Sequence, residues 1–139
     1  MVNDFTGQRV VNLIAQLDEA LDEATRAGIM EACGRKCARA GAVEAARQAN
    51  GDVGTLVATL RGWIGDDNIA IDGDTVSVRY PKCFCEMAHG IEGLSPTYCL
   101  CSAGWLSEMF ETASGHPVGV LIHETVIRGG TACRFTVKL

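Results

Sequence analysis

The sequence predicts an α+β domain, in which N-terminal helices accompany a four-stranded antiparallel sheet made of two hairpins with a helix between them. Apolar residues first recur at helical spacing, over about residues 6–63, and then alternate with polar residues from about residue 68. The alternation returns after one further helical segment, near the end of the chain. A length of 139 residues fits a single domain, 1–139, with a helical part over about 6–63 and a sheet-containing part over about 68–139.

Helical periodicity opens the chain. The first helix is predicted over about Thr6–Ala27, and Gly28 is expected to break or bend the chain before a second helix over about Ile29–Gln48. Asn50-Gly51 is a typical C-terminal signal for that second helix. The apolar stripe predicted for the first helix consists of Val10, Val11, Leu13, Ile14, Leu17, Leu21 and Ala24.

Two glycines interrupt the second predicted helix. Gly34 and Gly41 are seven residues apart and therefore lie on roughly one face. Because glycine weakens a helix by about 1 kcal/mol relative to alanine, the pair predicts a close approach by a backbone, side chain or ligand. Asp52 is placed to cap a third, short helix that runs through Trp63 and turns Leu56, Val57, Leu60 and Trp63 toward the core.

Strand-like alternation begins after this helix. The segments 68–71 and 74–80 predict a hairpin in which Asp72-Gly73 supplies the positive φ angles of a type I′ turn, and Pro81 ends the pairing. The segment Cys83–Cys101 has no clear period, and we expect an ordered loop with one short turn of helix.

A last helix and a second hairpin complete the prediction. The helix is expected over about Ser102–Ser114, stopped by Gly115 and Pro117. The hairpin is expected from Val118–Val126 and Ala132–Leu139, joined through the turn at 128–130. The inward face of its last strand is predicted to carry Cys133, Phe135, Val137 and Leu139.

Charge and hydropathy exclude several function classes. The net charge of −5, from 12 basic and 17 acidic residues, argues against nucleic acid as a partner. No window approaches the ~18 consecutive apolar residues of a membrane span, and the first residues do not read as a secretory signal. We therefore expect a cytoplasmic protein, where thiols stay reduced and the odd total of seven cysteines does not serve a disulfide framework.

Six of the seven cysteines fall into three pairs. Cys33 and Cys37 are one helical turn apart, so they share a face of the second predicted helix. Cys83 and Cys85 follow a strand, and Cys99 and Cys101 precede a helix. Cys133 stands alone on the last strand, where the roles of a buried small hydrophobe and of a ligand are weighted about equally.

Paired thiolates are soft ligands that select zinc, Cu(I) or iron–sulfur clusters. A structural zinc site needs four ligands, and we expect them from a subset of the six paired cysteines, with Cys83, Cys85, Cys99 and Cys101 as one tetrad. His89 lies inside the cysteine-rich loop and is the best histidine to complete such a site. An iron–sulfur cluster is the weaker alternative because the ferredoxin spacings are absent. His116 and His123 are expected on the surface or in a strand.

Thiol chemistry is the other interpretation of these cysteines. Cys101 stands just ahead of a predicted helix, where the helix dipole favours a thiolate. A hydrolase or transferase using Cys101 or Cys99 as nucleophile is therefore one alternative. A redox sensor that closes Cys33 and Cys37 reversibly is a second, although a disulfide four residues apart on an intact helix would be strained.

Four sequence blocks also carry a family resemblance. They are Cys33-Gly-Arg-Lys-Cys-Ala, Tyr80-Pro-Lys-Cys-Phe-Cys, Tyr98-Cys-Leu-Cys-Ser-Ala-Gly-Trp and the closing segment from Gly129. Over roughly residues 30–139 the chain resembles a family of uncharacterised prokaryotic proteins with the same cysteine blocks. It is more distantly similar to the 4-vinyl-reductase-like domain, which implies an α+β small-molecule-binding sensor module. Some relatives of this type are labelled amino-thiazoline carboxylate hydrolase-like.

Together these observations favour a cysteine-rich binding or sensor module over an enzyme. Its expected partners are a thiolate-bound metal, zinc first, and a small-molecule ligand. An apolar face on the first helix would also serve a homodimer.

Overall fold

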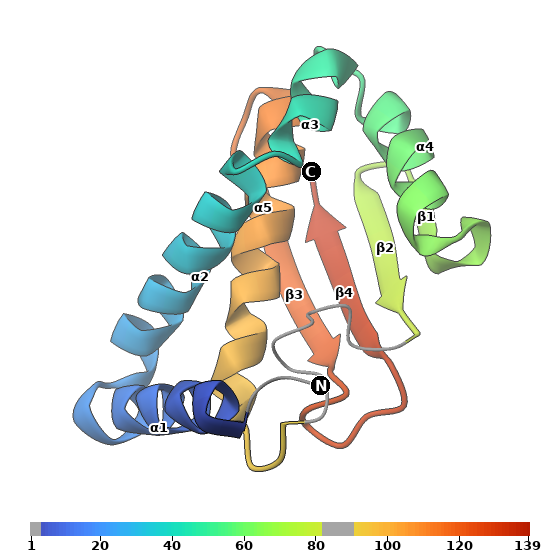
Figure 1. Cartoon of the computed structure of the whole chain (residues 1–139). Helices are drawn as coiled ribbons and strands as arrows, with labels where there is room; N and C mark the ends of the chain where they lie inside the picture. The colour runs from blue at the N-terminus through green and yellow to red at the C-terminus, as the bar shows by residue number, and fades with distance from the viewer. Residues whose placement is uncertain (1–3, 82–90) are drawn as a thin grey trace.

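Helices on one side of a single antiparallel sheet make up the structure, a computed structural model that describes residues 4–81 and 91–139 (Figure 1). The helices are α1 (Asp4–Ala20), α2 (Glu23–Arg39), α3 (Val43–Ala49), α4 (Val53–Ile64) and α5 (Leu100–Ser114). Two short 3₁₀ helices, η1 (Asp66–Asn68) and η3 (Pro96–Cys99), precede β1 and α5. The strands are β1 (Ile69–Asp72), β2 (Thr75–Tyr80), β3 (Gly119–Glu124) and β4 (Cys133–Lys138). The predicted α+β class is confirmed.

The sheet joins the two predicted hairpins through their second strands. Its order is β1-β2-β4-β3, and all three pairings are antiparallel. In the central pairing Val78 lies opposite Phe135 and Tyr80 lies opposite Cys133. The alternation predicted for the last strand is confirmed, because Cys133, Phe135 and Val137 are buried while Arg134 and Lys138 are exposed.

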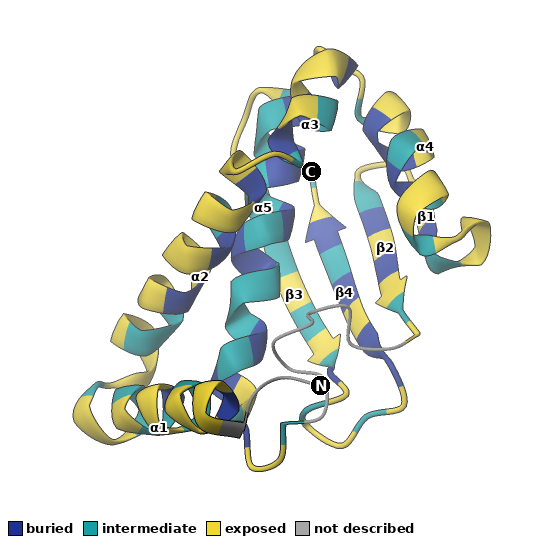
Figure 2. Cartoon of the chain, in the orientation of Figure 1, coloured by how far each residue is buried: buried dark blue, intermediate teal, exposed yellow. Residues whose placement is uncertain are grey.

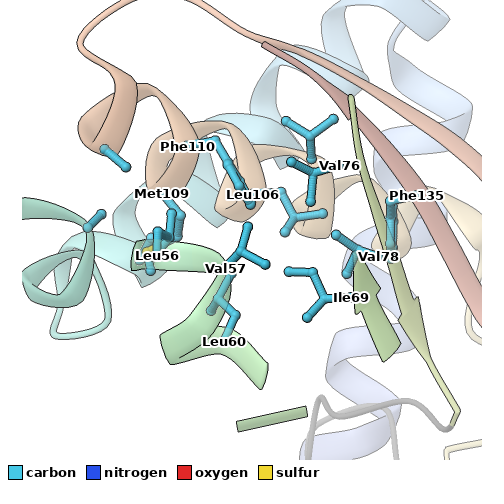
Figure 3. Close-up of a cluster of buried hydrophobic side chains, with 14 of the residues drawn as sticks. Leu56, Val57, Leu60, Ile69, Val76, Val78, Leu106, Met109, Phe110 and Phe135 are labelled. Atoms are coloured by element: carbon cyan, nitrogen blue, oxygen red, sulfur yellow. The ribbon is translucent and has the colours of Figure 1, made fainter. Parts of the chain in front are cut away.

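The main core lies between the sheet and the helices α3, α4 and α5. Figure 3 shows Phe110, Leu106 and Met109 of α5 meeting residues of α4 and of the strands. Each of these three α5 side chains is fully buried. Figure 2 shows the same pattern along the ribbon, with buried positions on the helix faces that turn toward the sheet. A second, smaller cluster around Ile14, Met30 and Leu94 lies apart from this core.

The N-terminal helices begin and end elsewhere than predicted. The first break falls at Leu21 and Asp22 rather than at Gly28, because the Asp22 carboxylate accepts a hydrogen bond of 2.7 Å from the Thr25 amide and thereby caps α2. Gly28 lies inside α2. The predicted second helix is two helices, α2 and α3, separated by a turn at residues 40–42.

The structure corrects the predictions made for Leu13, Trp63, the first hairpin turn and Gly41. Leu13 and Trp63, both expected to face the core, are 62% and 51% exposed. Gly73 alone has a positive φ, 60°, in the first hairpin turn, so the loop is Gly73-Asp74 and fits type II′ rather than type I′. The expected close approach at Gly41 is absent, since a Cβ atom there would meet nothing within 4 Å.

Candidate functional site

The predicted site residues lie in three places. Cys33 and Cys37 are both exposed on α2. Cys99 is buried at the end of η3, and Cys101 is half-buried in the first turn of α5. Cys133 is 7% exposed at the start of β4. The remaining predicted ligands, Cys83, Cys85 and His89, lie outside the described residues.

Cys101 and Cys133 both lie near the side chain of Tyr80. Tyr80 ends β2 directly opposite Cys133, and Cys101 approaches it from α5 closely enough to act on its charge. The Tyr80 and Phe135 rings are 5.3 Å apart, centroid to centroid, and tilted by 58°. We call Tyr80, Cys101, Cys133 and Phe135 the Tyr80 cluster. It closes one end of the main core, where β2 and β4 meet the first turn of α5.

The electrostatics of the Tyr80 cluster favour its neutral phenol. Burial raises the pKa of the Tyr80 hydroxyl well above its usual range, and the neighbouring Cys133 and Cys101 thiols raise it further. Tyr80 therefore stays protonated at neutral pH and keeps a hydroxyl proton to donate. Sequence reasoning missed Tyr80 as a site residue, because its position opposite Cys133 depends on the pairing of β2 with β4, which the two predicted hairpins do not specify.

The sulfur of Cys133 accepts a backbone hydrogen bond. The Val126 amide donates to Cys133 Sγ at 3.4 Å, from the segment that joins β3 to β4. That segment is tightly folded, since the Thr125 carbonyl accepts from both Arg128 and Gly130. This segment confirms the predicted turn at 128–130. Hydrogen bonds of this kind to sulfur occur at thiolate metal sites and stabilise negative charge on the sulfur.

A glycine crossing positions the Cys101 side of the cluster. A Cβ atom on Gly34 would lie 1.8 Å from the Cys101 carbonyl oxygen, and one on Gly104 would lie 1.9 Å from the Glu31 carbonyl oxygen. The backbones of α2 and α5 therefore touch, as the sequence predicts for Gly34. Further along the two helices, Arg35 binds Glu108 and Glu111 at 3.4 and 2.8 Å, and Arg39 binds Glu108 at 2.8 Å.

Cys101 does not lie at a free helix N-terminus. The 3₁₀ helix η3 runs directly into α5, and the Ser95 hydroxyl caps it by accepting from the Thr97 amide at 3.2 Å. The first amide groups of this continuous helical segment thus lie in the turn before Cys99, and Cys101 follows in the first turn of α5. A thiol-dependent enzyme and a redox sensor remain predictions.

No metal site is complete within the described ranges. In residues 4–81 and 91–139, no three His, Cys, Asp or Glu side chains gather closely enough to hold an ion. Half of the predicted tetrad, Cys83 and Cys85, is outside those ranges. His116 and His123 are exposed, as predicted, and His123 Nε2 lies 2.6 Å from the Thr136 hydroxyl. No helix in the same ranges is both long and apolar enough to cross a bilayer.

Comparison with known proteins shows a shared fold. No protein-family model matches the chain, and no curated protein matches it. Its structure is similar to the crystal structure of the phenol-responsive sensory domain of the transcription activator PoxR with phenol. The TM-score is 0.58, the sequence identity is 16%, and the match covers 99% of this chain and 76% of that chain. The chain therefore shares the fold of a small-molecule sensory domain over nearly its whole length.

Proposed function

We propose that this chain is a small-molecule sensor module that holds a thiolate-bound zinc ion, a small ligand, or both, at the Tyr80 cluster. The observation that carries the proposal is the meeting of Cys101 and Cys133, from separate elements, at the Tyr80 hydroxyl. The fold of the PoxR sensory domain, which is described as phenol-responsive, supports the sensor part. A cytoplasmic location, where thiols stay reduced, belongs to the same proposal.

The metal part rests on the chemistry of the donors. Thiolates select zinc, and zinc takes four of them at ~2.3 Å in a tetrahedron. Cys83 and Cys85 follow Tyr80 by three and five residues, so the chain can carry them at most ~11 Å and ~18 Å from it. They are therefore the first candidates to complete a site with Cys101, and Cys99 is the next. Zinc bound there would hold the ends of β2 and α5 together.

The proposed small-molecule ligand is inferred from the two aromatic side chains of the Tyr80 cluster. The rings of Phe135 and Tyr80 lie together at the edge of the main core, and Tyr80 carries a hydroxyl group. Ligand sites typically combine an apolar lining with a few polar groups that fix orientation. The ligand class proposed here is a small molecule with an apolar body and one hydrogen-bonding group.

Metal analysis of the full chain tests the proposal. Protein purified without chelator should carry about one zinc per chain, before or after anaerobic reconstitution. Cys101→Ser should lose zinc, whereas Cys33→Ser, at an exposed thiol on α2, should retain it. A metal-to-protein ratio near zero in both preparations would contradict the proposed zinc site.

Thermal denaturation tests the organic part separately. Phenol, as the probe, should raise the Tm of the wild-type chain in a concentration-dependent way, because a ligand that binds the folded state stabilises it. Tyr80→Phe should reduce that shift while leaving zinc content unchanged. A phenol-induced shift of equal size in both proteins would exclude the Tyr80 hydroxyl from ligand recognition.

A further inference from the structure

One short helix carries contacts to both α1 and the Tyr80 cluster. The 3₁₀ helix η3 ends at Cys99, two residues before Cys101. At its other end, the buried Thr97 hydroxyl donates to the Asp18 carboxylate of α1 at 2.5 Å. The Ser95 hydroxyl also bonds Asp18, and these bonds hold the pKa of that carboxyl below its ordinary value. Asp18 thus ties α1 to the turn that presents Cys101.

Two residues, Asp22 and Arg26, join the C-terminal end of α1 to α2. Arg26 of α2 approaches Asp18 at 3.4 Å and donates to the Leu21 carbonyl at 3.1 Å. Asp22, next in sequence to Leu21, caps α2 with its side chain. Figure 1 shows α1 crossing the lower ends of α2 and α5 as a separate arm rather than as part of the helix layer over the sheet. Leu21 and Asp22 thus form the non-helical link between α1 and α2.

The rest of α1 is held by apolar packing that includes Cys101. Ile14 of α1, Met30 and Leu94 form the second cluster, apart from the main core. Partly buried side chains complete it: Val10, Val11, Leu17, Ile91, Tyr98, Leu100, Cys101 and Ile127. Cys101 consequently belongs to the Tyr80 cluster and also packs against the second cluster. The opposite face of α1 is open, with Phe5 and Leu13 more than 60% exposed.

We infer that α1 is a hinged cover over the α5 side of the Tyr80 cluster, and that Asp18 is the positioning residue that holds the cover closed. Opening α1 would break the bonds from Asp18 to η3 and separate the second cluster. It would leave the main core intact, because the residues of that core come from other elements. The meaning of the cover for ligand entry rests on the proposed function, but access to Cys101 can be measured without any ligand.

Alkylation of the metal-free full chain tests the cover. Iodoacetamide labelling, followed by peptide mass mapping in the presence of chelator, gives a rate for each cysteine. Asp18→Asn and Thr97→Val should each raise the Cys101 rate about tenfold, the change expected when one charge-assisted hydrogen bond is lost from an opening equilibrium. Glu19→Gln removes the same charge from the exposed neighbour and should leave the rate unchanged.

Two other cysteines serve as internal references. Cys33 is exposed on α2, so its rate should be the same in every variant. Cys133 is buried in the main core and should stay slow. Equal Cys101 rates in wild type and both variants would overturn the inference. A parallel rise at Cys133 would also overturn it, because the whole domain would then be opening rather than α1.

The result is independent of the zinc measurement. A chain that binds no zinc but shows faster Cys101 labelling in the Asp18 and Thr97 variants retains the cover and loses the metal part of the proposed function. A chain that binds zinc but shows no change in Cys101 labelling retains the metal site and loses the cover.

Discussion

Gly34 lies directly against the Cys101 carbonyl oxygen, so closely that a Cβ atom in its place would be 1.8 Å from that oxygen. The neighbour is backbone and cannot rotate away. The α2–α5 crossing therefore depends on the absence of a side chain at this position. The main chain of Cys101 packs directly against α2.

Gly34→Ala should destabilise the domain by about 3 kcal/mol or more, because the added methyl group must push two backbones apart. Gly28→Ala is the matched control within α2. Nothing lies within 4 Å of its Cβ position, so the substitution should stabilise by ~0.5–1 kcal/mol through helix propensity. Urea unfolding of both variants gives the comparison. Similar effects in the two variants would contradict the close crossing.

Acid should weaken the α2–α5 crossing through Glu108. Hydrogen bonds from Arg39 and Arg35 hold the pKa of Glu108 below its ordinary value. A lowered carboxyl pKa stabilises the fold above the unfolded pKa of ~4.3, and that stability is lost as the pH falls through the lower native pKa. Glu108→Gln should therefore cost about 1 kcal/mol at pH 7 and progressively less below pH 4.

The control for this acid dependence is Glu44→Gln. Glu44 pairs with Arg47 at 3.2 Å, but both side chains are about 60% exposed. Solvent screens such a pair, so its loss should not change the midpoint of urea unfolding at either pH. An equal acid dependence in wild type and Glu108→Gln would show that the network does not act as described.

High pH should lower the stability of the fold through ionisation of Tyr80. Because the pKa of its hydroxyl is raised in the folded state, stability is complete below the unfolded tyrosine pKa of ~10 and is lost as the pH rises toward the higher native value. Absorbance at 295 nm, compared between wild type and Tyr80→Phe, isolates the ionisation of this phenol. The missing component should titrate above pH ~10 in native protein and near pH 10 in urea. Ionisation of native Tyr80 near pH 10 would contradict its burial beside two thiols.

Adjacent residues on α1 should differ sharply. Ile14 is 4% exposed in the second cluster, whereas Leu13 is 62% exposed. Ile14→Ala should cost ~2–5 kcal/mol, because it leaves a cavity under α1, while Leu13→Ala should stay within ~0.5 kcal/mol. Thermal unfolding of both variants, followed by helical and aromatic signals together, measures the two losses of stability. A larger loss for Leu13→Ala would indicate that its exposed face is covered in solution.

The fold class followed from periodicity because the two periods, 3.6 and 2, are properties of the backbone. The burial of Leu106, Met109 and Phe110 in α5 and of Phe135 and Val137 in β4 was predictable for the same reason. The break between α1 and α2 was not, since Asp22 lies in a run of helix-compatible residues and acts only through its bond to Thr25. Local capping chemistry decided what periodicity left open.

The candidate site was predictable only in part. Spacing made Cys101 a candidate site residue, but its meeting with Cys133 and Tyr80 depends on the pairing of β2 with β4, across more than 50 residues of sequence. The Asp18–Thr97 bond joins residues 79 apart in the chain. Neither residue has a sequence signal, because a single hydrogen bond between distant elements leaves no periodic pattern.

The place of β4 in the sheet has a consequence for synthesis. Cys133–Lys138 pairs with β2 on one side and β3 on the other, so the β1–β2 hairpin and the single strand β3 stay unconnected until these residues have left the ribosome. Non-local pairing of this kind slows folding. The part of α5 that packs against β4 would meanwhile remain uncovered. Exposed apolar surface on a nascent chain is where chaperones bind and aggregation begins.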